Sequence, residues 1–328
     1  MIAHSKPTIG VEEEEAVSRV LHSGMLAQGV EVAAFEVACA EFVGRKHGVA
    51  VSSGTAGLHL SLLALELTGK WVAFSSYACA ALVQSVCMAG AKAVLCDCDG
   101  DGNLDVSEVE ADVDGVLAAH LFGKVGALPT LGMPVIEDIA QSFGGPCGTG
   151  GVLSVVSFYA TKLITTGEGG MVFTDDDGLA ERLRDLRDYD NRDDFKPRFA
   201  YKMTEMQAAM GLAQLEKLPD FIGRRRAIAQ RYTEAFRDLP LRLPGGRDHI
   251  YFRYVVATST QKALMGYLES DGVCASRPVH HPAHFDLGGD YPEATRLHGE
   301  NVSLPIYPSM STGDVALVVE SVLRFFGA

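Results

Sequence analysis

Hydrophobic and polar positions follow two alternating periods along most of the chain, and these periods predict helices and strands in turn. Helical spacing of apolar residues covers 12–23 and 30–43, with Gly24 and Gly29 breaking the pattern between them. Further helices are predicted over 55–67, 180–187, 204–218 and 260–270. Short, almost wholly apolar runs predict strands at 47–52, 71–74, 93–98, 115–119, 134–137, 155–159 and 251–257. Strands that are apolar on both faces are typical of a mostly parallel sheet with helices on both sides.

One interruption divides this pattern. The segment from Leu239 to Gly246 carries two prolines and two glycines, and a strand and a helix follow it. We therefore expect residues 1–240 to form a large three-layer α/β domain around a mostly parallel mixed sheet. Residues 241–328 are expected to form a small C-terminal α+β domain.

Composition and charge narrow the class of protein. The chain has 328 residues, of which 47% are hydrophobic and 21% charged, as in a folded globular protein. Its formal net charge of −14 argues against nucleic acid or an anionic membrane as the main partner. The first fifteen residues lack a signal pattern, and no apolar run is long enough to span a bilayer. The seven cysteines form no CxxC pair, so we expect reduced thiols and a cytoplasmic protein.

Two local groups could belong to a ligand site. Ser52-Ser53-Gly54-Thr55-Ala56 lies where a strand passes into a helix, where backbone amides can bind a phosphate. An ordinary helix cap is the more frequent use of such residues. The apolar run Pro134–Ile136 ends in Glu137 and Asp138, which places a carboxylate at the ligand-binding edge of an α/β sheet. Asp138 could equally cap a loop or a helix.

A third group contains a lysine. Lys162 follows a predicted strand and precedes the turn from Thr165 to Gly170. Partial burial would lower its pKa and make it a usable nucleophile, although most single lysines lie on the surface. A phosphate cradle, an acid and a lysine are the three groups that pyridoxal phosphate requires of a protein.

The chain resembles the DegT/DnrJ/EryC1/StrS sugar aminotransferases, within fold type I of the pyridoxal-phosphate enzymes. The resemblance rests on the order and spacing of motifs along nearly the whole chain. They are residues 7–10, Ser23-Gly24, Ser53-Gly54-Thr55, His120-Leu121-Phe122-Gly123, Ile136-Glu137-Asp138 with Gln141, the segment around Lys162, Met203–Ala209 and Ser303-Leu304-Pro305.

The resemblance implies a role for several residues. Lys162 matches the lysine that holds the cofactor as a Schiff base, and Asp138 matches the acid that bonds the pyridine nitrogen. Gln141 matches a residue beside the cofactor ring and its 3-hydroxyl. Gly54, Thr55 and Ser157 match contacts to the phosphate. His284 and Glu168 are candidate substrate contacts.

The resemblance also implies a reaction and partners. The expected reaction moves an amino group, with glutamate as the donor, to a keto group of a nucleotide-linked sugar. A homodimer with active sites at its interface is expected. The alternatives are a sugar dehydratase of the same fold, which in the known cases has histidine in place of the lysine, and a non-catalytic regulatory relative.

Two departures from the family pattern concern the cofactor. Many relatives have an aromatic residue that stacks on the cofactor ring where this chain has Cys79, and Tyr77 lies two residues away. Many relatives also have an asparagine, donated to the phosphate by the neighbouring subunit, where this chain has Ala200.

Two further patterns suggest metal sites. Asp97–Glu108 matches the calcium loop of the EF-hand, but a predicted strand precedes it and no helix enters it. His280, His281 and His284 could be metal ligands, but only Asp286 joins them at a useful spacing. We therefore expect no metal site in either segment.

Overall fold

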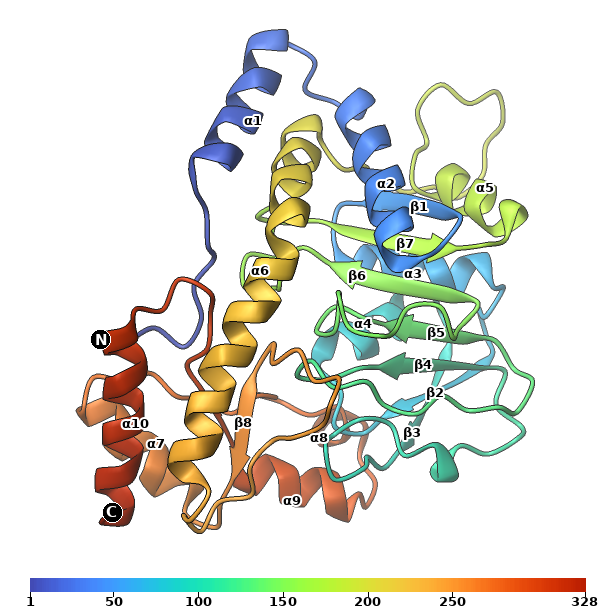
Figure 1. Ribbon diagram of the computed structural model, residues 1–328. Coiled ribbons are helices and arrows are strands. Elements are labelled where there is room, and N and C mark those ends of the chain that lie inside the picture. Colours follow the sequence, from blue (N-terminus) through green and yellow to red (C-terminus); the bar gives the residue numbers. More distant parts are fainter.

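The computed structural model describes all residues 1–328 and confirms the α/β class (Figure 1). Its helices are α1 (Val11–Ser23), α2 (Val30–Val43), α3 (Gly54–Ala64), α4 (Ala80–Met88), α5 (Asp177–Leu186), α6 (Glu205–Phe236), α7 (Gln261–Ser270), α8 (His284–Leu287), α9 (Pro292–Glu300) and α10 (Thr312–Phe326). Its strands are β1 (His47–Val51), β2 (Trp71–Ser75), β3 (Lys92–Cys96), β4 (Gly115–Ala119), β5 (Val135–Asp138), β6 (Leu153–Ser157), β7 (Gly170–Thr174), β8 (Tyr254–Ala257) and β9 (Asn301–Leu304).

The central sheet has seven strands in the order β1-β7-β6-β5-β4-β2-β3. Only β7 runs antiparallel to its neighbours β1 and β6, and every other pair is parallel. The mostly parallel mixed sheet expected from the sequence is therefore confirmed. Because all strands except β7 run the same way, their carboxyl ends meet at one edge of the sheet.

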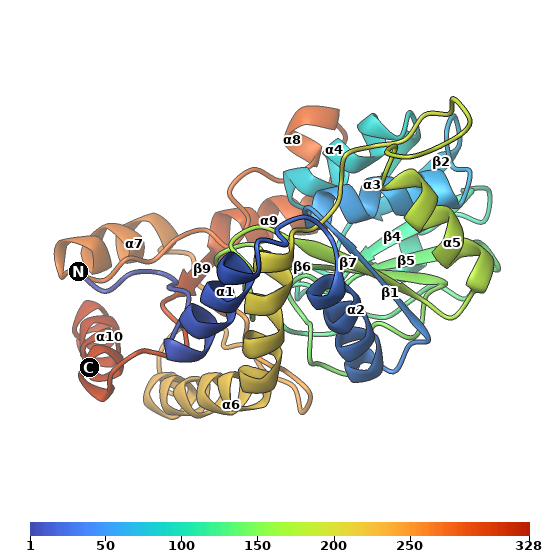
Figure 2. The same cartoon turned by 90° about the horizontal axis from the view of Figure 1, so that it is seen from above.

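Helices cover both faces of this sheet, as Figure 2 shows from above. Alternate side chains of each strand enter different clusters: Val49 and Val51 pack with α3 and α4, whereas Ala50 packs with α2 and α6. This alternation explains the apolar strand sequences, because both faces of each strand are buried. The sheet and the helices on its two faces therefore form three layers.

The long helix α6 differs from the expected helix over 204–218. It continues through Pro219 to Phe236, although proline lacks the N–H that would bond the carbonyl of residue 215. Side chains on both sides of the proline are buried: Leu218 and Phe221 in the cluster on the sheet, Tyr232 in the C-terminal cluster. Burial in two cores offsets a helix-interior proline, which costs about 3 kcal/mol.

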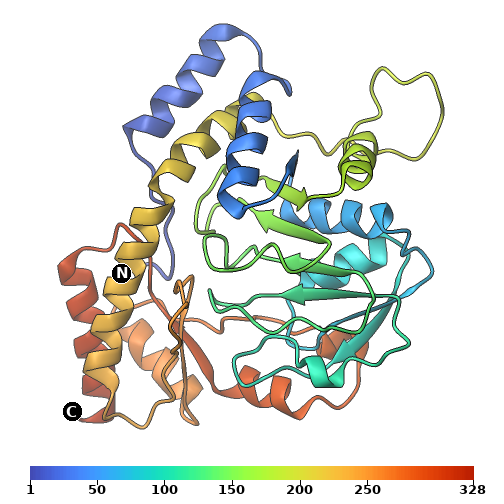
Figure 3. The ribbon, with the colours of Figure 1, turned by 45° about the vertical axis from the view of Figure 1, so that its right-hand side comes forward.

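The C-terminal part is a separate packing unit around the pair β8–β9, with α7, α10 and the second half of α6 (Figure 3). The first residues of the chain join it, because Ile2 pairs in parallel with Val273 and is buried in the same cluster. The domain boundary near residue 240 stays a prediction. No helix of the protein combines the length and apolar character needed to cross a membrane.

Candidate active site

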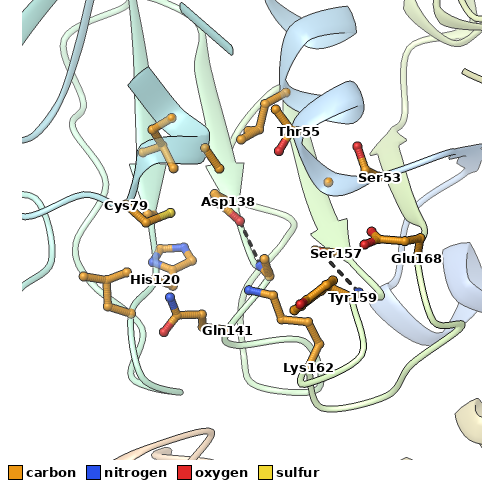
Figure 4. A pocket seen from close by; sticks show the side chains of 17 residues that line it. Ser53, Thr55, Cys79, His120, Asp138, Gln141, Ser157, Tyr159, Lys162 and Glu168 are labelled. Carbon is orange, nitrogen blue, oxygen red and sulfur yellow. Dashed lines mark hydrogen bonds between the residues drawn. The ribbon is translucent and has the colours of Figure 1, made fainter. Parts of the chain in front are cut away.

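One cavity lies at the edge where the parallel strands end (Figure 4). Its volume is about 210 Å³, and most of its lining comes from residues that directly follow strands β1, β2, β4, β5 and β6. Eight of the ten residues expected at the site line it: Gly54, Thr55, Cys79, Asp138, Gln141, Ser157, Lys162 and Glu168. The fold thus brings together motifs that are far apart in the sequence.

The first part of the cavity is the amino end of α3. Ser53 caps this helix, its hydroxyl accepting a hydrogen bond from the amide of Ala56 at 3.1 Å. The amides of Gly54 and Thr55 belong to the first turn, where no intrahelical acceptor exists. A Cβ at residue 54 would lie 2.7 Å from Cβ of Ser157, so only glycine lets the helix approach β6 this closely. The result is a cradle of free amides at the positive end of a helix, which suits a phosphate.

Asp138 ends β5 inside the cavity. Its Oδ1 accepts a hydrogen bond from the amide of Ala140 at 2.9 Å, and its other oxygen has no partner in the chain. Burial raises the pKa of this carboxyl, and the charge of Lys162 opposes the rise. The carboxylate can therefore accept one more hydrogen bond, and a cationic donor would stabilise its ionised form.

Lys162 lies in the turn after β6, where its amide bonds the carbonyl of Tyr159 at 2.9 Å. Its Nζ lies 5.4 Å from the centroid of the Phe252 ring, and no carboxylate comes within 4.0 Å of it. Burial lowers the pKa of this amine, and the charges of Asp138 and Cys79 oppose the change. Lys162 is therefore a partly desolvated amine, as expected of a nucleophile.

The turn that follows β4 orients Gln141. The amide of Phe122 donates to Gln141 Oε1 at 2.9 Å, an arrangement that leaves the side-chain NH₂ for the cavity. The hydroxyl of Ser142 donates to the carbonyl of His120 at 2.8 Å, so the turns after β4 and β5 are joined twice. The bond from the Phe122 amide fixes which end of the Gln141 amide points inward.

Sequence reasoning gave no role to His120, whose ring also lines the cavity. Its Nε2 lies 3.0 Å from Glu137 Oε2, and its Nδ1 accepts a hydrogen bond from the amide of Gly126 at 3.2 Å. Glu137 also accepts bonds from the amides of a loop, those of Gly148, Gly150 and Gly151. Burial alone would raise the pKa of Glu137, but these hydrogen bonds hold it at about 2. The only sequence signal for this pair was the position of Glu137 next to Asp138 in β5. Adjacent residues in a strand face opposite sides, so the two carboxylates point in different directions.

Two expected residues do not reach the cavity. Tyr77 is fully buried in the core, and its hydroxyl accepts a hydrogen bond from Asn301 Nδ2 at 3.4 Å. His284 is buried as well, and its Nδ1 donates to the carbonyl of Ser76 at 3.1 Å. After β2 the chain turns, and it places Cys79 at the cavity while the Tyr77 ring packs in the core beneath it.

The remaining lining residues include Glu168 and Tyr159. The carbonyl of Glu168 accepts hydrogen bonds from Thr166 Oγ1 at 2.6 Å and Gln207 Nε2 at 2.7 Å, whereas its carboxylate has no partner. Ser157 Oγ accepts from the amide of Tyr159 at 3.3 Å. Ala200 is exposed and does not line the cavity.

The segment that matches the calcium loop, Asp97–Glu108, has a structural role instead. Asp97 accepts hydrogen bonds from the amides of Glu293 and Ala294, at 2.9 and 3.0 Å, and so caps the start of α9. Asp99 accepts from amides within its own turn, and Asp101 pairs with Lys124. No group of three or more potential metal ligands is found, either here or around His280.

Comparison with known proteins places this geometry in a family. The profile of the DegT/DnrJ/EryC1/StrS aminotransferase family matches residues 7–323. The spore coat polysaccharide biosynthesis protein SpsC of Bacillus subtilis is 34% identical over 375 aligned positions, covering 98% of this chain and 96% of SpsC.

Solved structures of aminotransferases have the same fold as this chain. The aminotransferase TlmJ of Streptoalloteichus hindustanus is 29% identical and superposes with a TM-score of 0.92, with both chains covered completely. The sugar aminotransferase CalS13 of Micromonospora echinospora is 26% identical with a TM-score of 0.90, over 99% of this chain and 100% of CalS13.

Proposed function

Since the chain belongs to the DegT/DnrJ/EryC1/StrS aminotransferase family, we propose that it transfers an amino group from glutamate to a keto group of a nucleotide-linked sugar. The observation that carries this proposal is the single cavity that holds Lys162, Asp138 and the amino end of α3. Its relatives include a sugar aminotransferase and a polysaccharide biosynthesis protein, which supports a sugar as the acceptor.

Pyridoxal phosphate is the cofactor expected in this family, and the residues present fit it. The free amides of Gly54 and Thr55 suit its phosphate, together with the hydroxyl of Ser157. The open oxygen of Asp138 suits its ring nitrogen. When bound, the cofactor supplies a conjugated ring that withdraws electrons from the reacting carbon of the substrate.

Lys162 has two proposed tasks. Its amine would hold the cofactor covalently, which requires the neutral form that burial favours. The same amine, when free, would carry the proton to and from the reacting carbon of the substrate. Lys162 suits this second task because a lowered pKa makes the protonated amine release its proton more readily.

Other lining residues are proposed to orient the cofactor and to select the substrate. Asp138 would keep a proton on the pyridine nitrogen, and the NH₂ of Gln141, which the bond to its Oε1 leaves unused, would donate to the 3-hydroxyl of the cofactor ring. Cys79 occupies the place of the aromatic residue found in many relatives and leaves that side of the cavity less filled. The free carboxylate of Glu168 is the proposed acceptor for a sugar hydroxyl.

The proposed assembly is a cytoplasmic homodimer with active sites at its interface. Large apolar side chains are exposed on α1, α2 and the segment between them, which supports an apolar contact there. They are Val11, Leu21, Met25, Leu26, Val30 and Val37.

A transfer assay tests the proposal. The cofactor-loaded protein is incubated with ¹⁵N-glutamate and a panel of nucleotide-linked keto sugars, and the sugars are analysed by mass spectrometry. We expect a ¹⁵N-labelled amino sugar from the wild type and none from Lys162→Ala. The control Lys202→Ala should keep activity, because Lys202 pairs with Asp188 and Asp190 outside the cavity.

Other products would change the assignment. A sugar that loses a hydroxyl group without gaining nitrogen would identify a sugar dehydratase. A wild type that holds the cofactor but transfers nitrogen to no sugar would contradict the proposal, and so would undiminished transfer by Lys162→Ala.

A further inference from the structure

A second and much smaller cavity adjoins the turn that carries Lys162. Its volume is about 10 Å³, which leaves room for about one water-sized group. Four segments that are far apart in the sequence line it: the first residues of the chain, the turn after β6, the middle of α6 and the loop before α10. Lys162 lines both this cavity and the one at the sheet edge, whereas Thr8 and Arg225 line only the small one.

The lining includes a buried arginine with unused donors. Arg225 is 3% exposed, and its Nη1 donates to the carbonyls of Ile306 and Phe252, at 2.8 and 3.2 Å. Its Nε and Nη2 have no hydrogen-bond partner in the chain, and Nε is a buried atom. These two nitrogens form one edge of the planar guanidinium, and their N–H groups run parallel along it. Because a buried donor without an acceptor is unfavourable, we expect an acceptor in the cavity.

Thr8 is the other lining residue with an unpaired buried atom, its Oγ1. Its carbonyl accepts a hydrogen bond from Gln214 Nε2 at 2.9 Å, which holds this segment in place. The Gln214 side chain is engaged at both ends, since Nε2 also donates to Glu13 Oε1 at 2.7 Å and Oε1 accepts from the amide of Thr165 at 3.2 Å. The Thr8 hydroxyl therefore stays free to donate to a ligand.

All charged side chains in the lining are cationic. They are Lys6, Lys162 and Arg225, and no aspartate or glutamate lines the cavity. Burial lowers the pKa of Arg225 to about 9, so this side chain stays charged at neutral pH. Glu13, which Gln214 contacts, pairs with Lys217. A water would need acceptors for its two protons, whereas an anion needs only donors and also offsets the buried charge.

We propose that this cavity binds one monoatomic anion, chloride under ordinary salt conditions, through Arg225 and Thr8. The small volume excludes phosphate and organic anions. Lys6 and Pro7 are exposed, so the anion enters from the solvent beside the first residues of the chain. Once bound, it joins these residues to α6 and places a negative charge beside the turn that carries Lys162. The inference does not rest on the proposed function, because its evidence lies outside the cavity at the sheet edge.

Bromide, which scatters X-rays anomalously, locates the site in crystals of the full-length, cofactor-loaded protein. We expect an anomalous peak between Thr8 and Arg225 after a bromide soak. In solution, thermal unfolding is compared in sodium chloride and in sodium gluconate at equal ionic strength, because gluconate is too large for the cavity. The wild type should be stabilised by chloride, with a dependence on concentration that saturates.

Variants connect the two measurements. Thr8→Val keeps the shape of the side chain but removes its hydroxyl, so the chloride affinity should fall about tenfold. The matched control is Thr233→Val, whose hydroxyl lies 2.9 Å from that of Tyr254 in the C-terminal cluster and which should leave the chloride affinity unchanged. Arg225→Gln should abolish the effect of chloride. If that variant does not fold, because Arg225 also holds the carbonyls of Phe252 and Ile306, Thr8→Val decides.

Three outcomes would overturn the inference. The first is electron density for a group in the cavity without an anomalous peak, which would identify a water. The second is a bromide peak without any effect of chloride in solution, which would show binding at crystal concentration only. The third is a chloride effect of the same size in the wild type, Thr8→Val and Thr233→Val, which would place the responsible ion elsewhere.

Discussion

At the scale of single residues, burial shifts the pKa values of two groups in opposite directions. Burial lowers the pKa of Lys162 and raises that of Asp138. The charge of each group opposes the shift in the pKa of the other. The two groups do not form an ion pair within 4.0 Å, so each remains available to a ligand. A lysine and a carboxylate that share a cavity without forming an ion pair, both with shifted pKa values, are typical of a catalytic or ligand-binding site.

The first prediction concerns Asp138→Asn. An amide cannot hold a proton on the pyridine nitrogen, so we expect transfer to slow by several orders of magnitude. The side chain keeps its size and its bond from the Ala140 amide, so the cofactor should still bind and the protein should stay folded. Single-turnover rates with glutamate and absorbance of the bound cofactor measure the two effects. A rate close to that of the wild type would refute the role of Asp138.

A second prediction concerns the pH dependence of cofactor attachment. Only the neutral amine of Lys162 can attack the cofactor, and burial places its pKa below the usual 10.5. The attachment rate should therefore rise with pH and level off below pH 10.5. The growth of the cofactor's visible band, followed from pH 6 to 10, provides the measurement. A rate that still rises tenfold per pH unit up to pH 10 would be that of an ordinary exposed lysine.

At the scale of elements, local signals located some helices and missed others. The helices at 11–23 and 30–43 were predicted almost to the residue, because Gly24 ends one and Gly29 precedes the other. The sequence analysis did not identify α4, β7, α8, α9, β9 or α10. The strand β7 contains the short apolar run Met171–Phe173, the same local signal as the predicted strands, but its antiparallel pairing with β1 and β6 is set by the tertiary fold.

The third prediction concerns the cap that Asp97 provides across the two parts of the molecule. Asp97→Ala removes two hydrogen bonds from the first turn of α9. We expect the free energy of unfolding to fall by about 0.5–2 kcal/mol, the usual cost of losing a helix cap. Denaturant unfolding measures the change. The control Asp105→Ala loses only the cap of the short 3-10 turn Val106–Glu108 and should cost less. An equal or larger loss in the control would contradict the structural role given to Asp97.

At the scale of the whole molecule, the parts of the site that form continuous motifs could be predicted from the sequence. Lys162, Asp138 and the segment around Gly54 each follow a strand, and the parallel sheet brings them to one edge. Contacts made only by tertiary packing could not be predicted. The bond between His120 and Glu137 joins neighbouring strands, and His4 reaches Arg253 from the other end of the chain. The burial of Tyr77 could not be predicted for the same reason, because its hydroxyl bonds Asn301 in the C-terminal part.

The most direct test of the account asks which lysine carries the cofactor. The protein is saturated with pyridoxal phosphate, the imine is reduced with borohydride, and the modified peptide is identified by mass spectrometry. We expect the label on Lys162 alone, because it is the only lysine in the lining of the cavity. A label on another lysine, such as Lys202, or no label despite saturating cofactor, would contradict the assignment of this cavity as the active site.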